Sequence, residues 1–124
     1  MEHQKGFILY NLSNEMYLGR SLAATSGDTH RWVSDTPLLL CENALDMLFN
    51  INSFIPRSRF PNMKNTEFND HVKEIRRETK FVLSFLKEHS DMVEIMVVPI
   101  DVEGDGTSYD IDFVKAFKFD VNMV

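Results

Sequence analysis

The feature that most constrains the fold is a stripe of residues with helical spacing in the second half of the chain. Its members are separated by 4, 3, 4, 3 and 4 positions and are Phe68, Val72, Ile75, Thr79, Val82 and Leu86. This spacing places all of them on one face of a helix. Asn65 or Thr66 can cap the helix, and we expect it to run to about Glu88.

The second half of this predicted helix is apolar almost all round, because it adds Phe81, Leu83 and Phe85. We therefore expect that half to be deeply packed. Three heptads are too few for a coiled coil. A helix that lies across a sheet explains the stripe better.

Apolar runs between turn residues predict that sheet. The segments expected to be strands are 6–12, 16–18, 30–34, 93–102 and 109–121. A bulge near Val114 would absorb the break in the last alternation. Residues 20–29 are interpreted as a loop and residues 38–41 as a short buried run, while residues 42–51 fit a short helix that buries Leu45, Leu48 and Phe49. The result is an α+β fold: an antiparallel sheet of about five or six strands with one long and one short helix packed on it.

The length of 124 residues fits a single α+β domain, residues 1–124, with a core of its own. Cys41 is the only cysteine, which excludes an internal disulfide and favours a reducing compartment. The longest apolar runs, of about five residues, are too short for a membrane span or a signal peptide. We therefore expect a cytoplasmic protein that does not cross a membrane.

The net charge of −6 is concentrated in one part of the chain. Residues 88–114 contain eight acidic side chains and no Lys or Arg, and their two apolar runs around a glycine-containing turn predict a β-hairpin. Because carboxylates repel phosphates, we expect no duplex nucleic acid at this surface. Solubility is one explanation of the charge. The other is docking on a basic protein surface through Glu94, Asp101, Glu103, Asp105, Asp110 and Asp112.

Two patterns resemble metal sites. Residues 101–112 place oxygen ligands at positions 1, 3, 5 and 12 of a calcium loop, but strands rather than helices flank them, so we interpret them as an acidic turn. One face of the long helix could bind a transition metal through Glu67, His71, Glu74 and Glu78. Cations at pairing distance indicate a water-facing side instead: Lys73, Arg77 and Lys80. We predict no metal and no cofactor.

Catalytic motifs are not evident in the sequence. No motif surrounds His3, His30 or His89, and Cys41 lies in an apolar run, where a thiol is usually inert packing. We therefore do not expect an enzyme. A cleft that held Cys41 or His71 beside carboxylates of perturbed pKa would favour catalysis.

The segment 52–65 is basic and aromatic and contains no acid. Arginine forks suit phosphates and phenylalanine rings can stack on bases, which gives an alternative function. In this alternative the protein binds or sequesters a nucleotide through Arg57, Arg59, Arg76 and Arg77. The competing interpretation is that Phe54 and Phe60 anchor the segment to the core while its arginines are solvated.

Residues 7–50 are arranged as strand, Trp-bearing strand, turn, short strand and helix, carried by Met16-Tyr17-Leu18, Trp32, Asp35, Leu38-Leu39-Leu40 and Glu42-Asn43-Ala44-Leu45. This layout resembles the opening unit of many small phage-encoded accessory proteins, although Cys41 stands where an aromatic residue would be more usual. The resemblance implies a virus or mobile element as the source and a bacterial host cytoplasm as the location. Proteins of that kind often inhibit a host enzyme or defence system by binding it.

These observations predict a small non-catalytic binding protein, a phage or mobile-element accessory protein that inhibits a host defence or nucleic-acid-processing protein through the acidic hairpin. Its partner is expected to present a basic surface. The open edge of a hairpin sheet can also pair with a second copy, so a homodimer is a further expectation.

Overall fold

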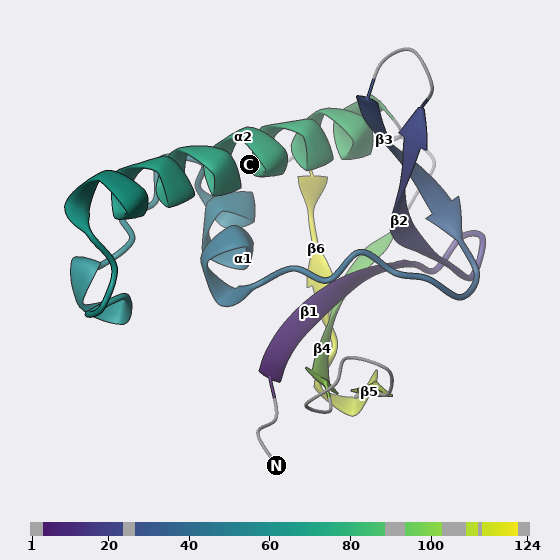
Figure 1. The fold of residues 1–124 in the computed structure, drawn as a ribbon. Helices are drawn as coiled ribbons and strands as arrows, with labels where there is room; N and C mark the ends of the chain where they lie inside the picture. Colours follow the sequence, from purple (N-terminus) through teal and green to yellow (C-terminus); the bar gives the residue numbers. More distant parts are fainter. Residues whose placement is uncertain (1–3, 24–26, 89–93, 103–108, 112, 122–124) are drawn as a thin grey trace.

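The computed structural model describes residues 4–23, 27–88, 94–102, 109–111 and 113–121. Its strands form one antiparallel sheet in the order β3-β2-β1-β4-β5, with β6 also paired to β4 (Figure 1). The strands are β1 (Gln4–Asn11), β2 (Met16–Ala23), β3 (Gly27–Val33), β4 (Ile95–Val102), β5 (Tyr109–Ile111) and β6 (Phe117–Phe119). The helices are α1 (Glu42–Phe49), α2 (Asn65–Glu88) and the short 3-10 turns η1 (Arg57–Arg59) and η2 (Phe113–Lys115). The predicted α+β fold is therefore confirmed.

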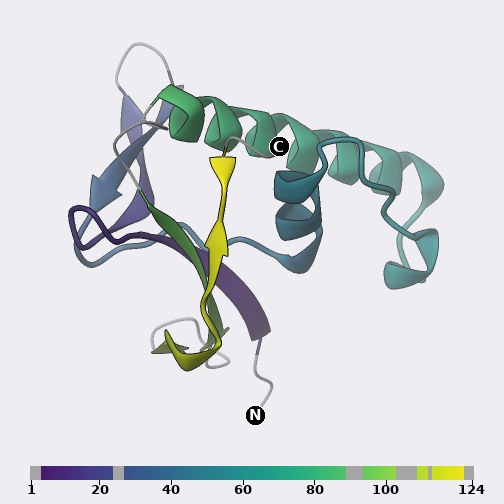
Figure 2. The same cartoon turned by 180° about the vertical axis from the view of Figure 1, so that it is seen from behind.

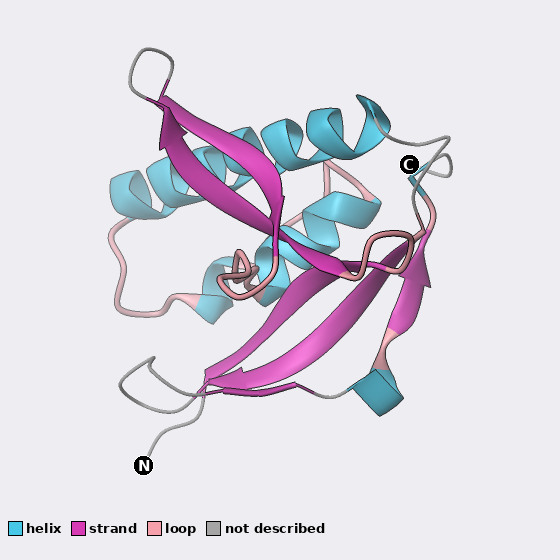
Figure 3. Ribbon diagram, turned by 90° about the vertical axis from the view of Figure 1, so that its right-hand side faces the viewer, coloured by secondary structure: helices cyan, strands magenta, loops and turns pink. Residues whose placement is uncertain are grey.

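The sheet consists of two ladders that share few hydrogen bonds. β1 pairs with β4 along its whole length, from Gln4↔Val102 to Asn11↔Ile95. β2 pairs with β3 from Tyr17↔Val33 to Ala23↔Gly27, but with β1 only at Tyr10↔Tyr17 and Asn11↔Met16. The β2–β3 ribbon therefore swings away from the β1–β4 ladder (Figure 3).

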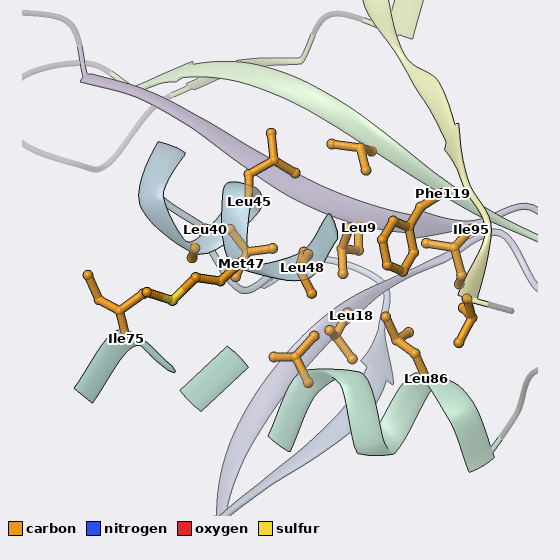
Figure 4. Packing of buried hydrophobic residues seen from close by; sticks show 14 of the residues in the cluster. Leu9, Leu18, Leu40, Leu45, Met47, Leu48, Ile75, Leu86, Ile95 and Phe119 are labelled. Carbon is orange, nitrogen blue, oxygen red and sulfur yellow. The ribbon is translucent and has the colours of Figure 1, made fainter. Parts of the chain in front are cut away.

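One face of the sheet packs on both helices and forms the main core. Alternate strand residues point to this face, among them Leu9, Leu18 and Phe119. They meet Leu48 from α1 and Leu86 from α2 (Figure 4). Each fully buried side chain of this size contributes about 1.5–3 kcal/mol relative to exposure. The helices lie on the same side of the sheet, as the view from behind also shows (Figure 2).

The opposite face has a smaller cluster around Ile8, Val98 and Ile100. Tyr10 contributes to this cluster, and its ring meets the ring of Phe113 edge to face at 5.4 Å. Phe113 belongs to η2, which interrupts the last part of the sheet. We expected one strand over residues 109–121 with a bulge near Val114. That prediction is wrong in detail, because η2 splits the segment into β5 and β6 and leaves Val114 96% exposed.

The long helix ends at Glu88 as the sequence predicted and begins at Asn65, which is its first residue rather than its cap. Ile75, Thr79, Val82 and Leu86 of the stripe are buried. The expectation that its second half packs all round is wrong. Phe81 is 56% exposed, and Leu83 and Phe85 are half-buried. The sheet covers one side of the helix, so the opposite side faces water.

Three other expectations need correction. Residues 20–29 are not a loop, because β2 continues to Ala23 and β3 starts at Gly27; backbone pairing supplies the hydrogen bonds whatever the side chains are. Residues 38–41 are not uniformly buried. Leu40 is buried and forms an isolated bridge with Phe7, whereas Leu39 and Cys41 are exposed. The short helix ends at Phe49, two residues earlier than expected, and Phe49 itself is exposed.

Candidate functional site

The predicted acidic surface is partly described. Asp101 is exposed and lies near the end of β4, where Asp110 of β5 is its direct register partner. On its other side the β1–β4 ladder places Lys5 opposite Asp101. The row across these three strands therefore contains two acids and one base. The sequence predicted no basic residue within the hairpin. The basic residue of this row, Lys5, belongs to β1 and therefore lies outside the hairpin.

Glu94 is separated from this row. It precedes β4, and its backbone N–H donates a hydrogen bond to the Ser13 Oγ atom at 3.3 Å while its carbonyl accepts from Leu12. Asp101 lies seven residues further along the extended strand, which corresponds to about 23 Å. The structure therefore does not bring Glu94 and Asp101 together. The predicted positions Glu103, Asp105 and Asp112, and the turn of the calcium-loop pattern, lie outside the described residues.

The ion pairs of the described residues involve other acids. Arg20 pairs with Glu78 at 3.3 Å, Arg77 pairs with Glu74, and Arg59 lies 3.4 Å from Asp46 and 3.9 Å from Glu42. Within the described ranges, neither Glu94 nor Asp101 makes an ion pair. Both carboxylates therefore remain accessible to a cation from outside the molecule.

The arginines predicted to bind a nucleotide make separate local contacts. Arg57 lies over the ring of Phe68 at 5.1 Å from the ring centre, and its Nε atom donates to Asn65 Oδ1 at 3.2 Å. Arg59 turns towards α1, where it donates to Asn43. Arg76 donates from Nε to the carbonyl of Ile51 at 3.0 Å.

Arg77 pairs with Glu74 of its own helix. The four predicted arginines therefore do not form one cluster, and Arg76 is the one that lines a groove beside this segment.

That groove lies between the loop after α1 and the first half of α2 and has a volume of about 360 Å³. The side chains that matter for recognition are Phe54, Phe68, Asn69, Lys73 and Arg76. One interpretation of the sequence is that Phe54 and Phe60 anchor the segment 52–65 to the core. This is wrong for Phe54, which is 82% exposed, whereas Phe60 is half-buried and contacts Phe68 and His71.

The polar face of α2 is organised by salt bridges. The pKa of Glu74 is lowered from its ordinary value of 4.5, first by the hydrogen bond from Arg77 and then by the charges of Arg77 and Arg20. Glu78 pairs with Arg20 of β2. Among the residues that the structure describes, no group of three or more His, Cys, Asp or Glu side chains is arranged to hold a metal ion. The interpretation of this face as a water-facing side with ion pairs is confirmed for the Arg77–Glu74 pair.

A second cavity, of about 240 Å³, lies under the middle of α2 and is lined by both Cys41 and His71. Cys41 caps α1, where its Sγ atom accepts from the Ala44 N–H at 3.4 Å, and its side chain is exposed rather than packed as expected. The presence of Cys41 and His71 in one cavity is part of the arrangement that would favour catalysis. The carboxylate of this cavity, however, is Glu78, which pairs with Arg20, and in the described part of the chain Cys41 and His71 share no hydrogen bond. Catalysis by Cys41 would require a base in contact with its thiol.

Sequence reasoning named Arg76 and the segment that holds Phe54, but it missed Lys73 and Asn69 of the groove and the exposure of Cys41. A signal for this exposure was present, because Cys41 immediately precedes a helix whose first residue is Glu42, and a residue at that position points its side chain at the helix end. Neither helix within the described residues combines the length and apolar character that crossing a membrane requires. No family model matches the chain, and neither a curated protein nor a solved structure matches it. The function therefore has to be argued from the geometry alone.

Proposed function

We propose that this protein is a non-catalytic binding protein that docks on a basic surface of another protein through the acidic edge formed by β4 and β5. The observation that supports this proposal is the register of Asp101 opposite Asp110. Carboxylates in direct cross-strand positions repel each other and destabilise a sheet by roughly 0.2–1 kcal/mol. An external cation between them would turn that repulsion into attraction.

The position of this pair in the sheet favours access by a partner. β5 is the last strand in the order β3-β2-β1-β4-β5, so it is an edge. With Lys5 of β1 in register with Asp101, the row contains two acids and one base and so has a negative formal charge. The remaining charge would attract a cationic surface over about one Debye length, which is near 10 Å at 0.1 M salt. Binding of this kind raises the association rate and weakens steeply with added salt.

The chemistry of the acidic edge suggests the class of partner. Proteins that bind or process nucleic acids carry Lys and Arg on the surface that meets phosphates. A protein with carboxylates at matching positions can occupy that surface and block it. The proposal therefore includes inhibition of a host nucleic-acid-processing or defence protein. The origin in a phage or mobile element and the location in a host cytoplasm stay predictions, as does the absence of catalysis.

A matched pair of double variants tests the acidic edge. D101N/D110N removes the cross-strand carboxylates, whereas E67Q/D70N removes two exposed carboxylates of α2 and changes the net charge equally. Each protein is immobilised and used for affinity capture from bacterial lysate at about 20 mM and about 300 mM salt, with identification by mass spectrometry. We expect wild type and the α2 variant to capture the same basic protein at low salt, and D101N/D110N to lose it.

Two results would contradict the proposal. One is a captured partner that is retained equally by D101N/D110N. The other is equal loss in both double variants, which would show that total charge matters and that the β4–β5 edge does not.

A further inference from the structure

We infer that the groove beside Phe54 is a binding site for a nucleotide unit, in which the base stacks on Phe54 and the phosphate is held by Arg76 and Lys73. The site lies on the first half of α2, on the far side of the molecule from β5 (Figure 1). It is therefore separate from the acidic edge and does not depend on the function proposed for that edge.

The first support is the way in which the chain displays Phe54. Phe54 is 82% exposed, although the next residue, Ile55, is buried in the main core. On the other side, the carbonyl of Ser53 accepts a hydrogen bond from Arg76 at 3.5 Å, and the N–H of Ser53 donates to the Asn50 carbonyl at 2.8 Å. The neighbours of Phe54 are thus fixed on both sides. A ring presented to water from a fixed backbone is suited to stacking, because the backbone loses little conformational entropy when a ligand binds.

The second support is the charge of the groove. The lining contains the cations Lys73 and Arg76 and no carboxylate. The guanidinium of Arg76 is already oriented by its bonds to the carbonyls of Ile51 and Ser53 and keeps further N–H donors for a ligand. Lys73 is exposed and, within the described residues, makes no ion pair. An anion therefore meets two cations here without a competing carboxylate in the lining.

The third support is the combination of groups around the ring. Asn52 and Asn69 line the same groove and offer amide donors and acceptors of the kind that read base edges. Arg57 does not line the groove but lies over the ring of Phe68, which does. An aromatic platform, amides and cations together fit a ligand with a flat heterocycle at one end and a phosphate at the other. The volume of about 360 Å³ accommodates one such unit.

The acidic net charge of the protein does not oppose this inference. At physiological salt, charges further away than about 8 Å are largely screened, so the local cations dominate. Among nearby acids of α2, Glu74 is paired with Arg77, and neither Glu67 nor Asp70 lines the groove.

Binding is measured by calorimetry and by NMR titration with four probes: AMP, adenosine, inorganic phosphate and a single-stranded pentanucleotide. One weak stack with one phosphate contact predicts a Kd for AMP of about 0.1–1 mM. Adenosine and inorganic phosphate should each bind at least about tenfold more weakly, because each lacks half of the interaction. A pentanucleotide that binds much more tightly than AMP identifies a single strand as the natural ligand, whereas equal affinity identifies a free nucleotide.

Matched variants locate the site. F54A should weaken AMP binding by about tenfold, the loss expected for one base stack. F81A is its control, because Phe81 is also an exposed phenylalanine beside an arginine, with Arg77 5.9 Å from its ring, yet it is outside the groove. K73Q should weaken binding, and K80Q, seven residues further along the same helix, should not. F54W keeps an aromatic surface and should retain binding.

The inference is overturned if no probe gives saturable binding up to about 10 mM, well beyond the expected Kd. It is also overturned if F54A binds AMP as wild type does, or if F81A and F54A lose affinity equally. Because Phe54 is exposed, F54A is expected to fold, and an unchanged melting temperature verifies this. None of these outcomes bears on the D101N/D110N experiment.

Discussion

The substitution L86A tests which side of α2 carries the stability of the fold. Leu86 is 0% exposed and packs in the main cluster between α2 and the sheet. Leucine-to-alanine substitutions at fully buried sites destabilise by about 2–5 kcal/mol, from lost transfer energy and the cavity that remains. Leu86 lies in the last turn of its helix, where neighbours can partly relax into the space, so we expect a loss of about 3 kcal/mol.

The comparison variant is F81A on the exposed side of the same helix. The ring of Phe81 is 56% exposed, and its contact with Arg77 at 5.9 Å is a surface cation–π interaction worth about 0.5–1 kcal/mol. Alanine is the better helix former by about 0.5 kcal/mol, which offsets most of that loss. The net change should therefore stay below about 1 kcal/mol, although phenylalanine is the larger residue.

Urea unfolding measures both free energies, with equal m-values as the check that the unfolded states are comparable. In thermal unfolding L86A should melt about 12 °C lower than wild type, at about 4 °C for each kcal/mol, and F81A within about 4 °C of it. Equal destabilisation by the two variants would refute the assignment of Leu86 to the core side and Phe81 to the water side.

Three further outcomes follow from local geometry. Glu15 has a positive φ of 58° in the β1–β2 turn, a left-handed conformation that glycine adopts without strain. E15G should therefore raise the free energy of unfolding in urea by about 0.5 kcal/mol. A lower free energy of unfolding would show that Glu15 is not in the left-handed conformation. The lowered pKa of Glu74 means that its pairing with Arg77 stabilises the fold above the ordinary carboxyl pKa and is lost as the pH falls through the folded-state value. In R77Q the Glu74 pKa, followed by carboxyl NMR, should rise towards 4.5, and an unchanged value would exclude Arg77 as the cause. The exposed thiol of Cys41 should react with a thiol reagent in the native protein, whereas reaction only after unfolding would show that it is buried.

The parts of the fold that the sequence predicted correctly are those encoded redundantly. Six positions of α2 repeat one spacing, so no single side chain had to be interpreted correctly for the helix to be found. The same pattern could not tell which of the additional apolar residues face water. Phe81, Leu83 and Phe85 look equivalent in the sequence, and the position of the sheet alone leaves Phe81 exposed while Leu83 and Phe85 are half-buried.

The candidate sites were harder to predict, because each depends on contacts between distant segments. Arg76 reaches the loop that displays Phe54 through carbonyls of Ile51 and Ser53, and carbonyl positions leave no trace in residue type. The separation of Glu94 from Asp101 could have been predicted from the sequence. Seven extended residues between them already imply about 23 Å, so one acidic patch that includes both was never compatible with a strand.

The full-length pairing of β1 with β4 has a consequence for the order of events during synthesis. β1 begins at Gln4, but its partner β4 does not begin until Ile95, and both helices are encoded between them. Because chains emerge from the ribosome N-terminus first, the edge of β1 that pairs with β4 stays unpaired until most of the protein has been made. Contacts this distant in sequence also slow folding. The nascent chain thus carries an apolar strand with an open edge until β4 is made, and such an edge can pair with strands of other chains.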